Sequence, residues 1–383
     1  MPGSNTQTIH AGQEADGMNT YSNFLGTGRT IGEDVGMQDA SHQGPVDSYL
    51  PTASSISAST STTDVTVAVI TTLPCEFNAA LRQLDEYDAG RNRLNDTVMI
   101  NCKPDFFVFV QGNILGQQIL LVKLVSPGVV DATGTAQHIV QNYSSIKLIV
   151  VVGVCAGVAN PSNGADLLIG DVVIGNAVLP YADGLHWYPD KVAQRNNILQ
   201  KSSSRKVRSL LGVLEDGLLI SQFEERLNTL KSRPTNLGRL FPANYHHVHR
   251  SSSRSQCTCD PDTGEACEDA LRANCKAIGC DDSMQIDRAS ADDGRIHVRI
   301  GPYASAPIIM RNPAIRDQMA ERFGILAFEM ELTGLWAFET PVVPIKGVCD
   351  YADSHKNKDW QEFAADTAAC AMKEFIRSYL GPG

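Results

Sequence analysis

The sequence contains no apolar run long enough to cross a membrane, and its first residues lack the basic-then-apolar layout of a secretion signal. It also lacks an excess of positive charge, since 32 Lys and Arg residues face 43 Asp and Glu residues. The resulting net charge of −11 disfavours general binding to nucleic acid or to an anionic membrane. We therefore expect a soluble, cytoplasmic protein with neither nucleic acid nor membrane as a partner.

Paired Cys-x-x-Cys units, which are typical of zinc modules, are also absent. Five of the ten cysteines nevertheless crowd into one polar segment, close to His246, His247 and His249. We interpret them as plain surface thiols without a catalytic role, while a local disulfide or a zinc site stays open as an alternative. No metal ligand and no cofactor is predicted. The five clustered cysteines are Cys257, Cys259, Cys267, Cys275 and Cys280, and those in core-like segments are Cys75, Cys102, Cys155, Cys349 and Cys370.

Two regions differ from the rest of the chain. Residues 1–63 are rich in Gly, Ser, Thr and Gln and offer little apolar surface to offset the entropy of ordering, so they predict a flexible, low-complexity tail. Residues 195–290 read as an insertion in a domain that spans 64–383. Within it, Val207, Leu211, Leu214 and Leu218 form a helical stripe ahead of the Cys-rich segment.

The remaining chain alternates apolar runs with amphipathic stretches. Near-continuous runs such as 65–72, 146–152 and 342–350 are typical of strands that are covered on both faces. Pro74 begins a helical pattern, and Met372, Phe375, Ile376 and Tyr379 give a closing helix one apolar face. This alternation predicts an α/β fold, a single three-layer α/β/α domain around a central mixed sheet.

Acidic residues stand where several of these runs end. Glu76 follows the first run, Asp350 ends the run from Val342, and Glu329 and Glu331 flank Met330 after a short run at 325–328. A buried carboxylate is costly unless it is paired, and the two hydroxyls of a ribose are a suitable partner. Because open α/β sheets bind ligands at the carboxyl ends of their strands, we expect these acids at one site.

The strand ends, taken in order, resemble the nucleoside phosphorylase/nucleosidase superfamily, in the branch that contains methylthioadenosine nucleosidases. The resemblance covers 64–380 apart from the insertion, and its most specific piece is Phe328-Glu-Met-Glu331 followed by Asp350. One departure is Ser305-Ala306-Pro307, where the family usually has Ser-Gly-Asp or Ser-Gly-Asn. The stretch 349–360 is similar to purine-nucleosidase modules that act as effector domains of fungal immune-type receptors, and the module is expected to stand here without a receptor.

This resemblance implies a role for each acid. Asp350 would protonate purine N7 as the general acid, and Glu76 would bind and deprotonate the attacking water. Glu331 would hold the ribose hydroxyls, with Met330 under the sugar and Glu329 beside it. The purine would contact Cys155, Ala156, Ile309 and Met310. The resemblance also implies a homo-oligomer, most simply a dimer, with 181–192 near the contact.

The loop after the first strand bears on whether water or phosphate is the nucleophile. It reads Thr71-Thr-Leu-Pro-Cys-Glu76, with no Gly and with no Arg before Arg82. Phosphate needs backbone donors and a guanidinium fork, and a carboxylate would repel it. The loop therefore favours hydrolysis of the N-glycosidic bond of a purine nucleoside or nucleotide. A phosphate-dependent phosphorylase and a non-catalytic nucleoside-sensing module remain the alternatives.

The prediction for the 5′ end of the substrate depends on the basic residues. A triphosphate needs several converging Lys or Arg donors, and the local basic density leads us to expect an adenine nucleotide, ATP first. A solvated surface would explain the same residues. The phosphate-binding candidates are Arg295, Arg299, Arg311, His247 and Arg250, with Lys201, Arg205 and Lys206 from the start of the insertion.

Overall fold

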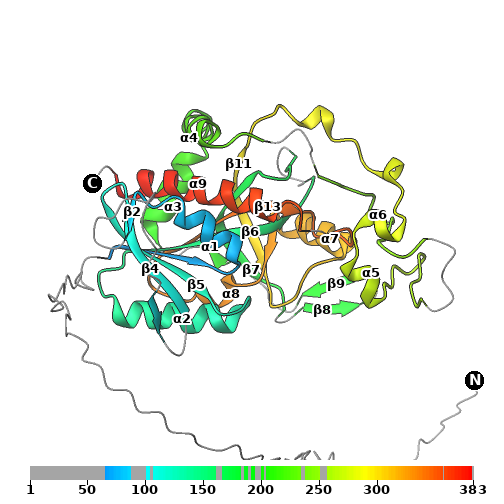
Figure 1. The fold of residues 1–383 in the computed structure, drawn as a ribbon, viewed down its shortest axis with the longest axis horizontal. Coiled ribbons are helices and arrows are strands. Elements are labelled where there is room, and N and C mark those ends of the chain that lie inside the picture. Colours follow the sequence, from blue (N-terminus) through cyan, green and yellow to red (C-terminus); the bar gives the residue numbers. More distant parts are fainter. Residues whose placement is uncertain are drawn as a thin grey trace, which may run out of the picture. The chain divides into compact units, whose positions relative to one another are not determined.

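The expected α/β fold is confirmed: a mixed sheet of eleven strands lies between helices on both of its faces (Figure 1). The computed structural model describes residues 65–87, 101–103, 107–160, 166–182, 185–188, 191–194, 200–201, 204–233, 238–250, 257–356 and 358–381. The predicted tail, 1–63, lies outside the described residues. Among the helices described, none combines the length and the apolar character needed to cross a bilayer.

One half of the sheet is built on β1 (Val67–Thr71), which pairs in parallel with β5 (Gln117–Leu124) and β6 (Leu148–Gly157). Every residue of β1 is buried, as the continuous apolar run predicts. The antiparallel β4 (Phe107–Ile114) extends the sheet beyond β5. Two short strands, β2 (Glu86–Tyr87) and β3 (Asn101–Lys103), pair with β4 at that edge.

The other half of the sheet is organised around β13 (Val342–Asp350), which runs parallel to β6 and antiparallel to β7 (Val172–Pro180). From β7 the sheet continues through β11 (Val298–Ser305) to β12 (Ala327–Glu329), which pairs antiparallel with the end of β6. These five strands therefore pair in a closed ring. The ring brings the carboxyl ends of β6, β12 and β13 together.

Helices cover the two faces with separate cores. On one face α1 (Pro74–Leu81) and α9 (Gln361–Leu380) pack together over β6 and β13, and on the other lie α2 (Val129–Asn142) and α8 (Leu332–Leu335). The predicted apolar face of α9 is buried. The backbone of α9 at Ala364 approaches β13 so closely that a Cβ on Gly347 would overlap it. The sheet ends are thus fixed by tight packing of α9.

The segment predicted to be an insertion, 195–290, contributes two helices rather than one continuous stripe. The helical conformation is interrupted at Glu215 and Asp216, between α3 (Arg205–Leu214) and α4 (Gly217–Leu230). The break changes the helical phase, so Val207, Leu211 and Leu214 are buried as predicted but Leu218 is 68% exposed, contrary to expectation. Both helices contact α9, where Arg226 pairs with Glu374 at 2.8 Å.

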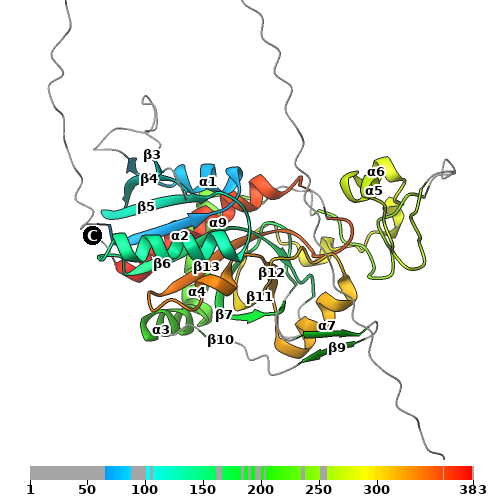
Figure 2. The same cartoon turned by 90° about the horizontal axis from the view of Figure 1, so that it is seen from below.

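Shorter elements complete the described chain. The two-residue β10 (Gln200–Lys201) pairs with β7, and β8 (Leu185–Tyr188) forms a hairpin with β9 (Lys191–Gln194). The helix α7 (Pro313–Phe323) follows β11. The Cys-rich segment carries α5 (Glu268–Arg272) and α6 (Cys275–Ile278), which lie beside the sheet layers in Figure 2.

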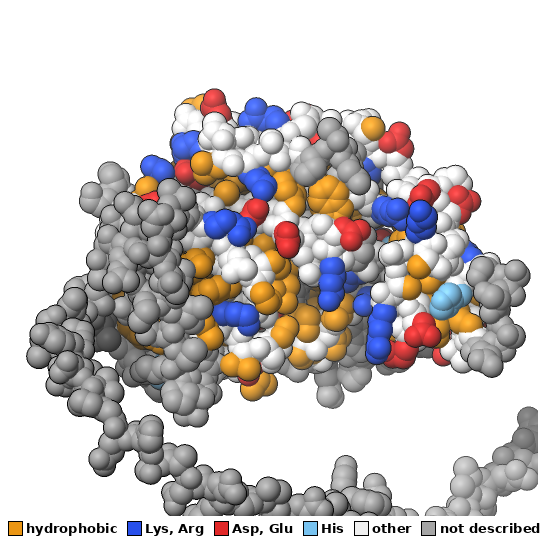
Figure 3. All heavy atoms as spheres, in the orientation of Figure 1, with side chains coloured by type: hydrophobic (Ala, Val, Ile, Leu, Met, Phe, Trp, Pro, Cys, Tyr) orange, Lys and Arg blue, Asp and Glu red, His pale blue; other side chains and the backbone are white. Residues whose placement is uncertain are grey.

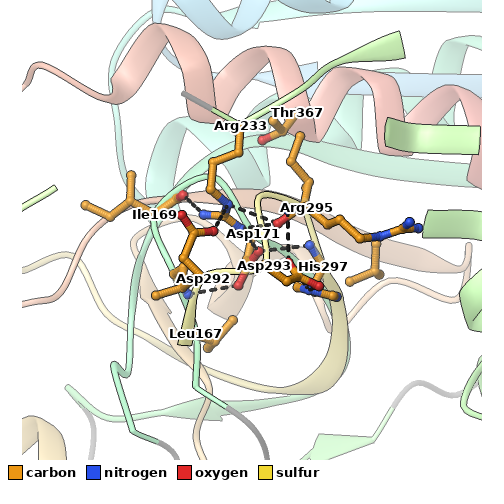
Figure 4. Close-up of polar contacts among 12 residues, drawn as sticks. Leu167, Ile169, Asp171, Arg233, Asp292, Asp293, Arg295, His297 and Thr367 are labelled. Atoms are coloured by element: carbon orange, nitrogen blue, oxygen red, sulfur yellow. Dashed lines mark hydrogen bonds and ion pairs between the residues drawn. The ribbon is translucent and has the colours of Figure 1, made fainter. Parts of the chain in front are cut away.

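A buried ion pair connects Arg233, in the predicted insertion, to the sheet (Figure 4). The Arg233 guanidinium, 1% exposed, donates to Asp171 and to the carbonyl of Ile169. It also reaches the carbonyl of Arg295 at 2.8 Å, and Asp171 accepts the His297 backbone amide at 2.9 Å. Since a buried charge is stable only when paired, this network explains the acid in the apolar Gly-Asp-Val-Val element that begins β7.

Candidate active site

A pocket of about 220 Å³ opens at the joined ends of β6, β12 and β13, next to the start of α1. Every residue predicted to be catalytic, ribose-binding or purine-binding lines it, although these residues come from five separate parts of the chain. The predicted site residues that line the pocket are Glu76, Cys155, Ala156, Ile309, Met310, Glu329, Met330, Glu331 and Asp350.

Glu76 is held by the backbone from two sides. Its Oε2 accepts the amide protons of Thr72 and Leu73 at 2.8 and 2.7 Å, and its Oε1 accepts that of Val154 at 2.8 Å. The approach to β6 requires Gly153, because a Cβ there would overlap the carboxylate. Burial raises the pKa of Glu76 above its ordinary value, and Lys346 and the amide donors limit that rise. A fixed carboxylate with a raised pKa suits a base that works near neutrality.

Lys346 forms the electrostatic centre of the site. This lysine of β13 is 3% exposed, and its Nζ lies 2.8 Å from Glu331 and 3.2 Å from Glu329. Burial would lower its pKa, but Glu331, Glu329 and Glu76 together raise it above the ordinary value. Lys346 is therefore a permanent cation among three buried carboxyl groups.

The pKa values of the two glutamates beside Lys346 are shifted in opposite directions. Burial raises the pKa of Glu329 above its ordinary value. Burial acts in the same direction on Glu331, but the nearer ammonium group of Lys346 brings the pKa of Glu331 below its ordinary value. Glu331 is therefore the more readily ionised of the two. Glu329 instead organises the backbone, since it accepts the amides of Glu331 at 2.9 Å and Leu332 at 3.1 Å.

Asp350, the last residue of β13, is paired with Lys356 from the following loop. The Nζ of Lys356 lies 2.9 Å from Oδ2, while Oδ1 accepts the amide of Ala352 at 3.0 Å. Burial lowers the pKa of Lys356, but the Asp350 carboxylate outweighs that effect and raises it overall. The pair places an acid and a proton-bearing ammonium at the pocket wall.

Much of the rest of the wall is apolar. Phe328 and Met330 line it beside Ile308, whose carbonyl accepts the Tyr181 hydroxyl at 3.2 Å. Tyr181 is fully buried and meets Phe328 edge to face, so it fixes the rim of the pocket. Such a surface, with a few convergent polar groups, suits a flat base and a sugar.

Ser305 is the residue that the turn Ser305-Ala306-Pro307 shares with the family pattern, and it is hydrogen-bonded to α8. The Ser305 hydroxyl accepts the Thr333 amide at 3.0 Å, and its carbonyl accepts the Thr333 hydroxyl at 3.1 Å. These bonds anchor the start of α8, directly after Glu331. The serine therefore steadies the segment that carries the glutamates.

Among the phosphate-binding candidates whose side chains the structure describes, none lines the pocket. Arg295 lends its carbonyl to the Arg233 network while its side chain extends away from that network (Figure 4), and Arg299 lies 3.7 Å from Glu224. Arg311 follows a pocket residue, but its Nη1 lies 3.4 Å from the carbonyl of Leu271. On the face drawn in Figure 3, Lys and Arg side chains are scattered among acidic and apolar ones.

The remaining two candidates belong to the Cys-rich segment. Arg250 stacks on Tyr245 and donates to the carbonyl of His246 at 2.7 Å. The Nε2 of His247 lies 3.0 Å from the carbonyl of Ala273. The described structure thus gathers the acids and the apolar wall at one pocket and places the basic candidates elsewhere.

Sequence reasoning missed Lys346 and Lys356. The signal for Lys346 is a single charged residue inside Val342–Val348, where every other side chain is apolar. A lysine at such a position is retained only when carboxylates pair with it. Lys356 has no comparable signal, because it stands in a polar loop.

The family model of the phosphorylase superfamily matches residues 66–380. A nucleotide-binding leucine-rich repeat (NLR)-like protein of Hyaloscypha variabilis is 24% identical over 331 residues, which are 81% of this chain but 29% of that protein, so the chain spans less than a third of its relative.

Two solved structures cover most of the chain. The 5′-methylthioadenosine/S-adenosylhomocysteine nucleosidase of Neisseria meningitidis, in complex with methylthio-immucillin-A, is 17% identical with a TM-score of 0.46, over 82% of this chain and 99% of that one. The futalosine hydrolase of Helicobacter pylori is 13% identical with a TM-score of 0.47, over 82% and 97%. Because the family model covers nearly all of the described residues, the chain belongs to the phosphorylase superfamily.

Proposed function

We propose that the chain hydrolyses the N-glycosidic bond of a purine nucleoside or nucleotide of the adenine type, releasing the base and the ribose or ribose phosphate. The observation that carries this proposal is the placement of Glu76. Its carboxylate accepts hydrogen bonds from the backbone amides of Thr72 and Leu73. These are the donors that the loop after β1 would otherwise offer to phosphate. With those donors occupied by a negative charge, water is the nucleophile that fits.

Each carboxyl group then has a part in the reaction. The base would lie against Cys155, Ala156 and Phe328, with its N7 near the Asp350–Lys356 pair. The bond from C1′ to N9 breaks, and its electron pair moves into the purine while N7 receives a proton from Asp350. Asp350 enters this step protonated and regains its proton from solvent after the base leaves, while Lys356 stays a cation beside it.

The sugar becomes cationic as that bond breaks. Glu331, kept ionised by Lys346, would accept hydrogen bonds from the ribose 2′ and 3′ hydroxyls and stabilise the developing positive charge. Met330 would lie under the ring. A water on Glu76 attacks C1′ from the opposite face, and its proton passes to the Glu76 carboxylate, so inversion at C1′ is expected.

The test is to incubate the full chain with adenosine, with and without phosphate, and to identify both products. Adenine and free ribose, formed at a rate independent of phosphate, are the expected result. Ribose 1-phosphate as the sugar product would show that the reaction is phosphorolysis and not hydrolysis. Binding of adenosine in calorimetry without any release of base would instead make the domain a sensing module.

A further inference from the structure

The Cys-rich segment holds two clusters of cysteine and histidine away from the pocket. In the first, the ligand atoms of His249, Cys257, Cys259 and Cys267 all lie within 4.8 Å of one another. In the second, those of His247, Cys275 and Cys280 do the same. The expectation of separate surface thiols is therefore wrong, because all five thiols are buried or half-buried and grouped around a histidine.

The first cluster has the dimensions of a tetrahedral metal site. The Nδ1 of His249 lies 3.2 Å from the sulfur of Cys257 and 3.5 Å from those of Cys259 and Cys267. The sulfurs of Cys257 and Cys267 are 3.6 Å apart. Zinc bonds of about 2.3 Å to sulfur and about 2.0 Å to nitrogen give tetrahedral edges of roughly 3.5 to 3.8 Å. A disulfide would need about 2.0 Å between sulfurs.

Backbone amides support the sulfurs in the way that thiolate ligands require. The amide of Cys259 donates to the sulfur of Cys257 at 3.4 Å, and the amide of Cys267 donates to that of Cys259 at 3.3 Å. Hydrogen bonds of this kind stabilise negative charge on the ligand atoms around a metal. Surface thiols that are merely close neighbours have no need of them.

The second cluster has an oriented histidine. The Nε2 of His247 lies 3.0 Å from the carbonyl of Ala273 and must donate its proton there, which leaves Nδ1 as the nitrogen with a free lone pair. That Nδ1 lies 3.7 Å from the sulfur of Cys275 and 3.5 Å from that of Cys280. A carbonyl that fixes the tautomer is typical of histidines that ligate metals.

The segment also has little else to hold it together. Between Pro242 and Gln285, the described apolar side chains that are buried are Val248, Ala270, Cys275 and Ile278. So small a core rarely stabilises a segment of this length without a metal or a disulfide. The two clusters are nested, since the loop from His247 to Cys280 encloses the loop from His249 to Cys267, and each closure would reduce the entropy of the unfolded segment.

We propose that these two clusters bind zinc: a closed four-ligand structural site at His249, Cys257, Cys259 and Cys267, and a three-ligand site at His247, Cys275 and Cys280 whose fourth position is left to solvent. The second site adjoins the loop that follows Asp350. The amide of His247 donates to Ser354 at 3.0 Å, and its ring meets His355 edge to face. His355 in turn stacks on Phe241 with ring centroids 4.0 Å apart. Zinc at this site therefore steadies the backbone that carries Lys356.

The test is elemental analysis of the full chain purified without chelators, together with visible spectra after exchange into cobalt. We expect about two zinc ions per chain, and cobalt spectra with the ligand-field and sulfur-to-metal bands of tetrahedral thiolate sites. Cys259→Ser and Cys280→Ser should each lose about one ion. The matched control Cys370→Ala changes a buried cysteine of α9 and should keep both.

Three results would overturn the proposal. Protein that holds no zinc, even after refolding with zinc sulfate, would remove both sites. A disulfide between Cys257 and Cys267 in non-reducing peptide mapping would replace the first site. A content of one ion that disappears in Cys259→Ser but survives in Cys280→Ser would remove the second site alone.

Discussion

The Nζ of Lys346 lies 2.8 Å from Glu331, which lines the pocket, and both side chains are buried. The pair explains how a carboxylate can stay ionised where the sugar is expected, since a buried charge needs a partner of opposite sign. Because Lys346 lies in β13, the same ion pair contributes to the stability of the sheet and to the charge of the carboxyl group proposed to bind the ribose.

The first prediction concerns this pair. Lys346→Met leaves Glu331, Glu329 and Glu76 without their cation, so the free energy of unfolding should fall by about 3–5 kcal/mol in urea titrations. The matched control is Lys373→Met, which breaks the half-exposed pair with Asp85 and should cost below about 1 kcal/mol. Equal losses in the two variants would contradict the role given to Lys346.

The second prediction concerns pH. A base works only when deprotonated, and the pKa of Glu76 is raised by burial, so kcat/KM should fall with decreasing pH at higher pH values than an ordinary glutamate would give. Glu76→Gln should lower kcat by about 10²–10⁴-fold. The exposed Glu321→Gln in α7 is the control and should leave the pH profile unchanged. An acid limb that persists in Glu76→Gln would assign it to another group.

The third prediction separates Asp350 as an acid from Asp350 as a structural residue. Asp350→Asn should lower adenine release by about 10²–10⁴-fold while adenosine binding persists. With p-nitrophenyl riboside, whose leaving group needs no proton, the same variant should lose far less activity. If both substrates suffered alike, Asp350 would hold the loop at Lys356 in place rather than donate a proton.

The strand-end acids could be predicted because their signal is local. A continuous apolar run followed by Glu76 or Asp350 can be recognised from the sequence alone. A strand that is covered on both faces places the residue after it at the carboxyl end of the sheet. For Lys346 the sequence shows only a lone charge inside an apolar run, and its partners Glu331 and Glu76 could not be predicted because they meet it only in the fold. Leu218 was mispredicted since two polar residues, Glu215 and Asp216, restart the helix in another phase.

The cysteines were misread for a related reason. Zinc modules are recognised from two-residue gaps between cysteines, whereas here Cys257 and Cys259 are separated by one residue and Cys267 stands alone. Only the folded backbone brings His249 against them. Cysteine spacing alone therefore misses clusters of cysteine and histidine that are brought together by turns of the folded backbone.

The fourth prediction is a dimer that covers the pocket mouth. Ile308 and Ile309 line the pocket yet are about half exposed, and Val130, at the start of α2, is 84% exposed. Light scattering should show a dimer, and Val130→Asp with Ile309→Asp should weaken it. Leu218→Asp changes an apolar residue that is 68% exposed, on the helix layer of the other face, and should not weaken the dimer. A fully active monomer would contradict this expectation.

The last prediction concerns the 5′ end of the substrate. Recognition of a triphosphate requires several cationic donors at one place, but among the described lining residues the only cation is Lys356, which Asp350 already engages. Arg299, Arg311 and Arg250 lie against Glu224, the carbonyl of Leu271 and Tyr245 instead. We therefore expect kcat/KM to be higher for adenosine and methylthioadenosine than for AMP and ATP at a fixed ionic strength. Arg311→Gln, next to the pocket, and Arg299→Gln, remote from it, should leave the ratio of adenosine to ATP unchanged. A preference for ATP that Arg311→Gln abolishes and Arg299→Gln preserves would assign the triphosphate to the Arg311 side of the pocket.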